Sequence, residues 1–149
     1  MNIEIRPAIP TDVQSIFELI KELAIYEKAP DQVSNTPEAL ARDLFEKNLC
    51  QAIVALQDSE IVGFALYYTS YSTWKGACLY LEDFYVKQDQ RRLGIGKLLF
   101  DEIVQIAQKT NVKRMDWQVL DWNEPAIQFY KKQGAILDVE WVNGRLFFE

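Results

Sequence analysis

The sequence predicts an α/β (α+β) fold, with a mixed, mostly antiparallel sheet of about seven strands and four helices. Three observations support this fold class. Strand-like apolar runs and helical apolar stripes follow one another along the chain, and a glycine-bearing turn at 94–96 connects a strand to a long helix. A length of 149 residues, 49% of them hydrophobic, suits a single domain over 1–149.

The first third of the chain predicts one strand and two helices. Residues 3–6 alternate like a short strand. Thr11 and Gln14 have the spacing of a capping box, which indicates the start of a helix. Thr36 is expected to cap a second helix, which begins at a proline and runs over 37–48.

The rest of the chain predicts two hairpins, two further strands and two further helices. The long central helix is expected from its apolar stripe, and the last hairpin from the Asn143-Gly144 pair. In chain order these elements are a hairpin at 52–56 and 61–69, a strand at 78–86, a helix with the stripe Ile95, Leu98, Leu99, Ile103, Ile106 and Ala107, a strand at 112–120, a helix from the cap Asn123 to Gly134, and the tail hairpin.

The composition excludes several functional classes. The chain has no histidine, so triad hydrolases and His-ligated metal enzymes are not expected, and neither is a bound metal. A net charge of −6 attracts cations and repels phosphate backbones, which argues against a nucleic-acid partner. The same charge could simply keep the protein soluble. It therefore favours cationic over anionic substrates but does not identify one. Without a membrane-spanning run or a signal-peptide pattern, we expect a cytoplasmic protein with no membrane partner.

A phosphate-binding turn is indicated where the strand at 78–86 leads into the central helix. The segment Arg91-Arg92-Leu93-Gly94-Ile95-Gly96-Lys97 opens that helix, and amides at a helix N-terminus can bind an anion. It is not a P-loop, because Arg91 stands where that motif needs glycine and Leu98 is neither Ser nor Thr. It is not a dinucleotide fingerprint either, because Leu99 replaces the third glycine.

The remaining Arg-x-x-Gly-x-Gly pattern resembles the coenzyme A pyrophosphate loop of the GNAT acetyltransferase superfamily. The resemblance extends over nearly the whole chain and is closest to the diamine (spermidine/spermine) and thialysine acetyltransferase branch. The stretches that carry it are Ile5-Arg6-Pro7-Ala8, Ile20-Lys21-Glu22-Leu23-Ala24 with Tyr26-Glu27, Ile61-Val62-Gly63-Phe64-Ala65, Tyr80-Leu81-Glu82-Asp83, Gly94-Ile95-Gly96, and Trp122-Asn123-Glu124-Pro125 with Phe129-Tyr130-Lys131.

The resemblance implies a GNAT-like fold and acetyl-CoA as the acetyl donor, with no metal. It implies that Glu82 is the base that deprotonates the amine and that Tyr130 is the acid that protonates the leaving thiolate. The residues implied to bind the cofactor are Phe84, Tyr85, Val86, Arg91, Arg92, Leu93, Gly94, Ile95, Gly96, Lys97, Asn123, Glu124, Pro125, Ala126, Tyr130 and Lys131. Those implied to bind the amine are Tyr26, Glu27, Trp74, Glu82, Asp116, Trp117 and Gln118.

Two carboxylates interrupt the apolar strand at Glu82 and Asp83. Since neighbouring side chains of a regular strand point to opposite faces, these two are not expected to act as a pair. Each candidate also has a structural interpretation: Glu82 as a strand-edge carboxylate, and Tyr130 as a core aromatic on the helical face of Ala126 and Phe129.

The acceptor is expected to be a small primary amine, and the assembly a homodimer by the same resemblance. The stretch Glu140-Trp141-Val142-Asn143-Gly144-Arg145 departs from the acidic pair and Gly-Trp typical of diamine acetyltransferases, which keeps a thialysine-like acceptor open beside polyamines. Two alternatives remain: a coenzyme A-binding sensor without turnover, and an acetyltransferase for protein amines.

Overall fold

A computed structural model describes residues 2–91 and 93–148. The chain divides into two compact units, the first ending at Gln118 and the second beginning at Val119. Because Arg92 lies outside the described residues, the proposed role of its side chain is not addressed by the structure.

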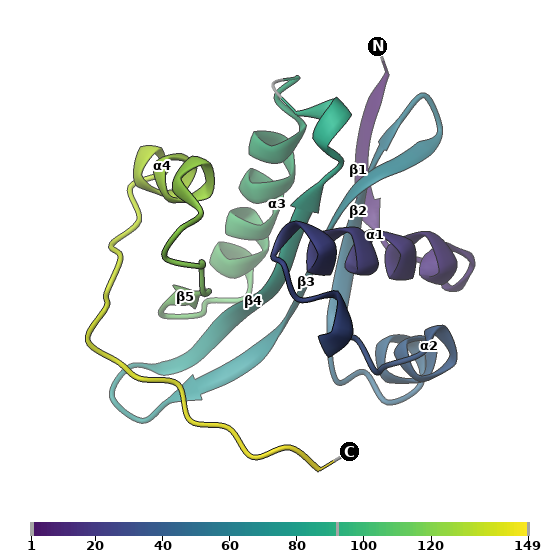
Figure 1. Cartoon of the computed structure of the whole chain (residues 1–149). Coiled ribbons are helices and arrows are strands. Elements are labelled where there is room, and N and C mark those ends of the chain that lie inside the picture. Colours follow the sequence, from purple (N-terminus) through teal and green to yellow (C-terminus); the bar gives the residue numbers. More distant parts are fainter. Residues whose placement is uncertain (1, 92, 149) are drawn as a thin grey trace. The chain divides into compact units, whose positions relative to one another are not determined.

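The first unit is built on a sheet with the strand order β1-β2-β3-β4-β5 (Figure 1). β1 to β4 are antiparallel neighbours, and β5 runs parallel to β4. The strands are β1 (Ile3–Pro7), β2 (Gln51–Gln57), β3 (Glu60–Ser72), β4 (Gly76–Val86) and β5 (Met115–Asp116). The helices of this unit are α1 (Val13–Tyr26), α2 (Pro37–Phe45) and α3 (Ile95–Lys109), with the short 3-10 turns η1 (Pro10–Asp12), η2 (Pro30–Gln32) and η3 (Gln88–Gln90).

Helices cover both faces of the sheet, as strand alternation requires. Phe64 and Tyr85 belong to the buried cluster formed with α1 and α2. Phe84, the neighbour of Tyr85, points the other way and packs edge to face on Phe100 of α3, with 5.7 Å between ring centres. β4 therefore lies between two apolar layers, with α1 on one face of the sheet and α3 on the other (Figure 1).

The start of α1 differs from the capping box expected at Thr11 and Gln14. The helix begins at Val13 after η1, with no side-chain cap among the described residues. The buried carboxylate of Asp12 instead accepts the backbone N–H of Ile9 at 2.9 Å and pairs with Arg6 at 2.7 Å. Burial raises the pKa of Asp12, but the bonds from Arg6 and Ile9 outweigh it and the net shift is downward. A partly buried ion pair thus fixes the turn at which the Thr11 hydroxyl was expected to cap the helix.

The other predicted caps are present. The N–H of Ala39 donates to Thr36 Oγ1 at 3.2 Å, and α2 then runs as predicted but ends at Phe45, three residues early. In the second unit, α4 (Glu124–Lys132) begins after Asn123, whose side-chain oxygen accepts from the Ala126 N–H at 3.4 Å. It ends near Gly134, which has a φ of 86° as a helix-terminating glycine requires.

The predicted fold class is confirmed, but the described part of the chain has five strands where about seven were expected. Of the strand at 112–120, only Met115–Asp116 pairs with a neighbour. Across 135–148, all of which the structure describes, the predicted hairpin around Asn143-Gly144 is not formed. Leu98, assigned to the buried stripe of α3, is 46% exposed.

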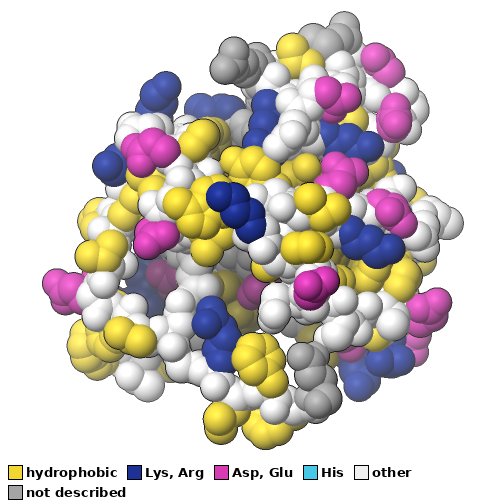
Figure 2. Space-filling view, in the orientation of Figure 1, with side chains coloured by type: hydrophobic (Ala, Val, Ile, Leu, Met, Phe, Trp, Pro, Cys, Tyr) yellow, Lys and Arg dark blue, Asp and Glu magenta, His cyan; other side chains and the backbone are white. Residues whose placement is uncertain are grey.

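The surface carries intermingled charge. Figure 2 shows acidic, basic and apolar side chains interspersed over the visible face, without a large area of one sign. In the described ranges, no helix has the length and apolar character needed to cross a membrane.

Candidate active site

The middle of β4 contains a β-bulge at Glu82. Asp83 pairs with Leu66 of β3 and Leu81 pairs with Tyr67, so Glu82 has no partner in the register. A bulge adds one residue and interrupts the alternation of side chains. The expectation that Glu82 and Asp83 point to opposite faces assumed a regular ladder, and the ladder is interrupted at this position.

The bulge brings three carboxylates into electrostatic contact. Burial, together with the smaller effects of the Glu82 and Glu27 charges, raises the pKa of Asp83 to about 7. Burial also raises the pKa of Glu27, with a second contribution from Glu82. Glu27 directly follows the last residue of α1, so the end of this helix and the centre of β4 together form the acidic cluster Glu27, Glu82 and Asp83.

Tyr68 of β3 lies beside this cluster. Burial raises the pKa of its phenol, and so do the charge of Glu82 and a hydrogen bond with the Glu82 side chain. The Tyr68 ring also stacks on Tyr80, with 5.3 Å between ring centres. Tyr68 therefore orients Glu82, which is the exposed member of the acidic cluster.

One edge of β4 is open directly after the acidic cluster. β5 pairs with β4 only at Leu79 and Tyr80, whereas β3 pairs with β4 as far as Val86. On the side opposite β3, the main chain of Phe84 and Tyr85 thus has no neighbouring strand in the described structure. An extended ligand with amide groups could hydrogen-bond there as a further strand would.

The turn at the start of α3 has the features of an anion site. Gly94 has a φ of 81° and precedes the helix, with no side-chain cap and no acidic residue in the first turn among the described residues. The first helical bond runs from the Leu98 N–H to the Gly94 carbonyl oxygen, so the amides of 95–97 point out of the helix end. A Cβ added to Gly94 would meet no atom within 4 Å, so the space beside the turn is open.

Two basic side chains of this turn, those of Arg91 and Lys97, contact other groups of the protein. Lys97 Nζ contacts both carboxylate oxygens of Asp101, at 2.8 and 2.9 Å. The guanidinium of Arg91 lies over the rings of Tyr26 and Tyr85 and donates to the Val86 carbonyl oxygen. The main chain is thus the part of this turn that best fits a pyrophosphate, while Leu93 is a partly exposed apolar residue within it.

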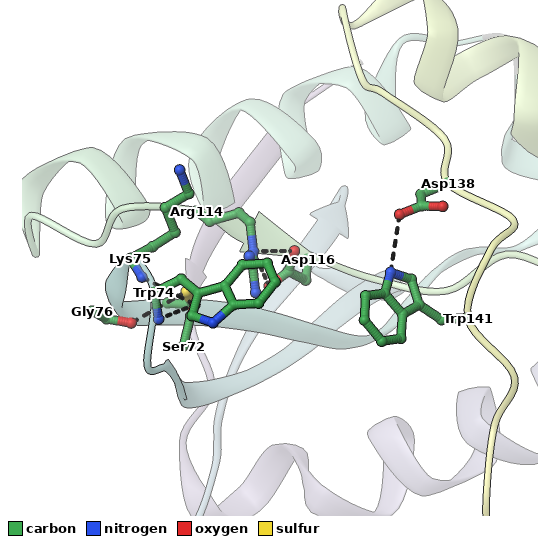
Figure 3. Close-up of polar contacts among 9 residues, drawn as sticks. Ser72, Trp74, Lys75, Gly76, Arg114, Asp116, Asp138 and Trp141 are labelled. Atoms are coloured by element: carbon green, nitrogen blue, oxygen red, sulfur yellow. Dashed lines mark hydrogen bonds and ion pairs between the residues drawn. The ribbon is translucent and has the colours of Figure 1, made fainter.

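The residues proposed on β5 and beyond lie at the other end of β4. Figure 3 shows Asp116 paired with Arg114, whose Nε lies 2.8 Å from Asp116 Oδ1. Trp117 packs edge to face on Phe100 of α3 at 5.6 Å, and Gln118 is exposed. Trp117 therefore contributes to the packing of α3.

Trp74 lies in the turn between β3 and β4. The backbone N–H of Trp74 donates to Ser72 Oγ at 3.2 Å, and the indole side chain is 84% exposed (Figure 3). β4 begins at Gly76, six residues before Glu82, which corresponds to roughly 20 Å along a strand. Within one chain, Trp74 is not brought to the acidic cluster.

The proposed residues of the second unit lie on α4. Asn123 caps the helix, Glu124 accepts from Gln128 Nε2 at 2.7 Å, and Pro125 and Ala126 form its first turn. Tyr130 is buried and packs edge to face on Phe129 at 5.6 Å between ring centres. Lys131 lies in the last turn. Figure 3 also shows the tail of this unit, where Trp141 Nε1 donates to Asp138 at 3.1 Å.

A groove of about 380 Å³ lies away from these residues. It is formed by α1 and the segment 30–37, and none of the predicted site residues lines it. The acidic cluster is the candidate site, because three carboxylates influence one another there and the open edge of β4 adjoins them. Among the described residues, no group of three or more Cys, Asp or Glu side chains is arranged to hold a metal ion.

Sequence reasoning missed Asp83 and Tyr68 as members of the site. Asp83 was noted only as the neighbour of Glu82, and the bulge that unites them has no signature in the letters. Tyr68 is one of several aromatics in β3, and only the register shift after Leu66 places it beside Glu82.

Comparison with known proteins agrees with this architecture. The Acetyltransferase (GNAT) family matches residues 13–135. Thialysine N-epsilon-acetyltransferase from Bos taurus is 42% identical over 140 residues, which covers 88% of this chain and 82% of the relative. Spermidine/spermine N(1)-acetyltransferase-like protein 1 from Homo sapiens is 40% identical over 141 residues, 89% of this chain and 20% of the longer human protein.

A solved structure with 20% identity supports the fold. It is an aminoglycoside acetyltransferase from an uncultured soil metagenomic sample, in complex with trehalose, and it matches with a TM-score of 0.81 over 99% of this chain and 97% of its own. The resemblance found in the sequence motifs is thereby confirmed, including the thialysine and spermidine/spermine branch. The chain is a member of the GNAT family of acetyltransferases.

Proposed function

We propose that this acetyltransferase moves the acetyl group of acetyl-CoA directly onto a primary amine of a small cationic acceptor, either a polyamine or diamine, or a thialysine-like amino acid. The observation that carries the proposal is the acidic cluster Glu27, Glu82 and Asp83, which adjoins the open edge of β4. Clustered carboxylates attract an ammonium group, because the cation relieves their mutual repulsion.

The reaction needs a proton acceptor near the amine. An alkylammonium has a pKa of about 10.4, so at neutral pH its nitrogen lacks the free electron pair that attacks a thioester. Glu82 is the proposed base, because it is the exposed carboxylate of the cluster and Tyr68 orients it. Asp83 and Glu27 are the proposed anchors of the cation. When the new C–N bond forms, the C–S bond of the thioester breaks.

The cofactor is proposed to lie along β4 and over the start of α3. The donor supplies an activated acetyl thioester, a pantetheine arm with two amides and a pyrophosphate. The main chain of Phe84 and Tyr85 would hydrogen-bond the arm, and the amides of 95–97 would hold the pyrophosphate beside the open space at Gly94.

Tyr130 is the proposed acid that protonates the departing thiolate. This assignment rests on its place in the family motif, and the side chain is a buried phenol on α4. Asn123, Glu124, Pro125, Ala126 and Lys131 are proposed to contact the cofactor on the same ground.

The test is release of free thiol from acetyl-CoA in the presence of an amine panel. We expect turnover with one or more of thialysine, lysine, ornithine, putrescine and spermidine, with sequential initial-velocity patterns. Glu82→Gln and Tyr130→Phe should each lower kcat by about 10²-fold or more, the range typical of lost acid–base catalysis.

The controls are Glu60→Gln and Tyr71→Phe, because both side chains are exposed and lie outside the proposed site. Ping-pong kinetics, or full activity in Tyr130→Phe, would contradict the mechanism. Tight coenzyme A binding without turnover on any amine would favour a sensor. Turnover on peptides and not on the small amines would favour a protein acetyltransferase.

The tail supports a proposal on assembly. Large apolar side chains in 136–148 are each at least 67% exposed, namely Ile136, Val139, Trp141, Val142, Leu146, Phe147 and Phe148. Such a surface indicates a protein partner. We propose that a second copy of this chain covers it, in a homodimer that sedimentation analysis can test.

A further inference from the structure

Arg91 stands at the head of the segment expected to bind the pyrophosphate, but its side chain contacts protein groups. The guanidinium carbon lies 4.8 Å from the centre of the Tyr26 ring and 5.4 Å from that of the Tyr85 ring. Its Nε–H donates to the Val86 carbonyl oxygen at 3.0 Å. A guanidinium stacked on aromatic faces is stabilised there, and the Nε–H of Arg91 is already bound to the main chain at the end of β4.

Arg91 contacts the C-terminal half of α1, which has fewer buried apolar side chains than the N-terminal half. The buried side chains of α1 are Val13, Ile16, Phe17 and Leu19, all in its first half. In the second half, Ile20, Leu23 and Tyr26 pack against the core but are only partly buried. In the second half, the attachments to the end of β4 are polar or aromatic. The Tyr85 hydroxyl donates to Glu22 Oε1 at 3.2 Å, and Arg91 stacks on Tyr26.

The position of this helix end determines the position of Glu27. Tyr26 is the last residue of α1, and the Glu27 N–H bonds back to the Leu23 carbonyl oxygen at 2.8 Å. The chain then turns sharply at Lys28, which has a φ of 63°. Glu27 can therefore move relative to Glu82 and Asp83 only if the helix end moves with it.

We propose that Arg91 is a positioning residue that holds Glu27 in the acidic cluster, and that it does not bind the pyrophosphate. The proposal rests on the proposed function for the role of Glu27 as an anchor of the amine. Arg91 would then affect specificity for the amine, while the main-chain amides of 95–97 bind the pyrophosphate of the cofactor.

The experiment separates the two binding sites by calorimetry, which does not depend on turnover. Coenzyme A is titrated into the free enzyme, and thialysine and spermidine are each titrated into the enzyme saturated with coenzyme A. For Arg91→Gln we expect an amine Kd that rises about tenfold, equivalent to about 1.4 kcal/mol, and a coenzyme A Kd that changes less than about threefold. Lys109→Gln, an exposed cation at the far end of α3, is the matched control.

The opposite result would overturn the proposal. If Arg91 binds phosphate, Arg91→Gln weakens coenzyme A binding about tenfold and leaves the amine Kd unchanged. Parallel weakening of both ligands would indicate general damage to the fold and would also overturn it. Absence of turnover in the wild-type enzyme would contradict the proposed function alone, since both Kd values remain measurable.

Two further variants test whether Arg91 acts through Tyr26. Arg91→Lys keeps the charge over the rings but loses the Nε–H bond, and we expect an amine Kd between those of the wild type and Arg91→Gln. Tyr26→Leu should weaken amine binding as Arg91→Gln does, and the double variant should be little worse than either. Fully additive effects would show that the two residues act independently, contrary to the proposal.

Discussion

Asp83 illustrates how one inserted residue changes the chemistry of a strand. In a regular ladder the carboxylates of Glu82 and Asp83 would face opposite layers, and each would be solvated or paired separately. At the bulge, Asp83 is within electrostatic reach of both Glu82 and Glu27, and this largely desolvated carboxyl acquires a pKa of about 7. The protonation state of Asp83 therefore changes within the physiological pH range.

Asp83→Asn should stabilise the protein in a pH-dependent way. The folded-state pKa of about 7 lies above the ordinary value of 3.8, so the folded protein binds the extra proton and ionisation opposes folding. The cost is absent below about pH 4 and complete above about pH 7. We expect the variant to gain about 1 to 4 kcal/mol of unfolding free energy at pH 8 and none at pH 4, measured by urea denaturation.

The control for this measurement is Asp31→Asn, a change at an exposed aspartate of η2. Its stability difference from the wild type should stay the same across the pH range. An Asp83→Asn effect that does not vary with pH would show that the carboxyl is not held in its neutral form by the fold.

The carboxylates of the site were partly predictable from the sequence. Glu27 and Glu82 could be named because they lie in family motifs, and an acidic residue inside an apolar strand is conspicuous. The contribution of Asp83 could not be named, because a bulge depends on how β3 and β4 are aligned and not on the residues of β4 alone.

At the scale of elements, local chemistry predicted the helices better than the strands. The cap at Thr36 and the cap at Asn123 are both present, because a cap joins groups only a few residues apart. The strand at 112–120 is reduced to Met115–Asp116, since pairing depends on a distant partner and β4 offers one only at Leu79 and Tyr80.

The turn at Gly94 yields a prediction for α3. Gly94→Ala should lower the free energy of unfolding by about 1 to 2 kcal/mol, because its φ of 81° is unfavourable for a residue with a Cβ. Coenzyme A binding should weaken as well, since the amides of 95–97 follow this residue directly. Thermal denaturation and calorimetry provide the two measurements.

Gly96→Ala is the matched comparison for stability. Gly96 lies within the first turn of α3, and an added Cβ would meet Phe84 Cζ at 3.8 Å, an ordinary contact. We expect its stability to be unchanged or slightly higher, as for alanine in a helix. Equal losses in both variants would show that the backbone angle at Gly94 is not the cause.

At the scale of the whole molecule, the predicted single domain is described as two compact units, and the family match extends across both. The architecture of sheet and helices was predictable because the motifs occur in order along most of the chain. The conformation of the tail could not be predicted in the same way. The alternation around Asn143-Gly144 indicates that the segment can pair, but it does not identify the strand with which it pairs.

The proposed homodimer can be tested through this tail. We expect the wild-type protein to sediment as a dimer at micromolar concentration, and Val142→Lys combined with Phe148→Lys to shift it towards monomer. Both side chains are more than 90% exposed, at 95% and 93%, so the substitutions remove apolar contact surface without disturbing a buried core. Leu49→Lys, at another exposed apolar residue, should leave the dimer intact. A monomeric wild-type protein would contradict the proposal.

The divergence of β4 and β5 has a consequence for how such an enzyme can change over time. A ligand recognised as an extra strand is recognised by peptide groups, which every residue type except proline supplies in full. Side chains along this stretch are then free to vary with the needs of core packing. Substitutions can therefore change the acceptor side of the protein while the proposed main-chain binding of the donor is kept.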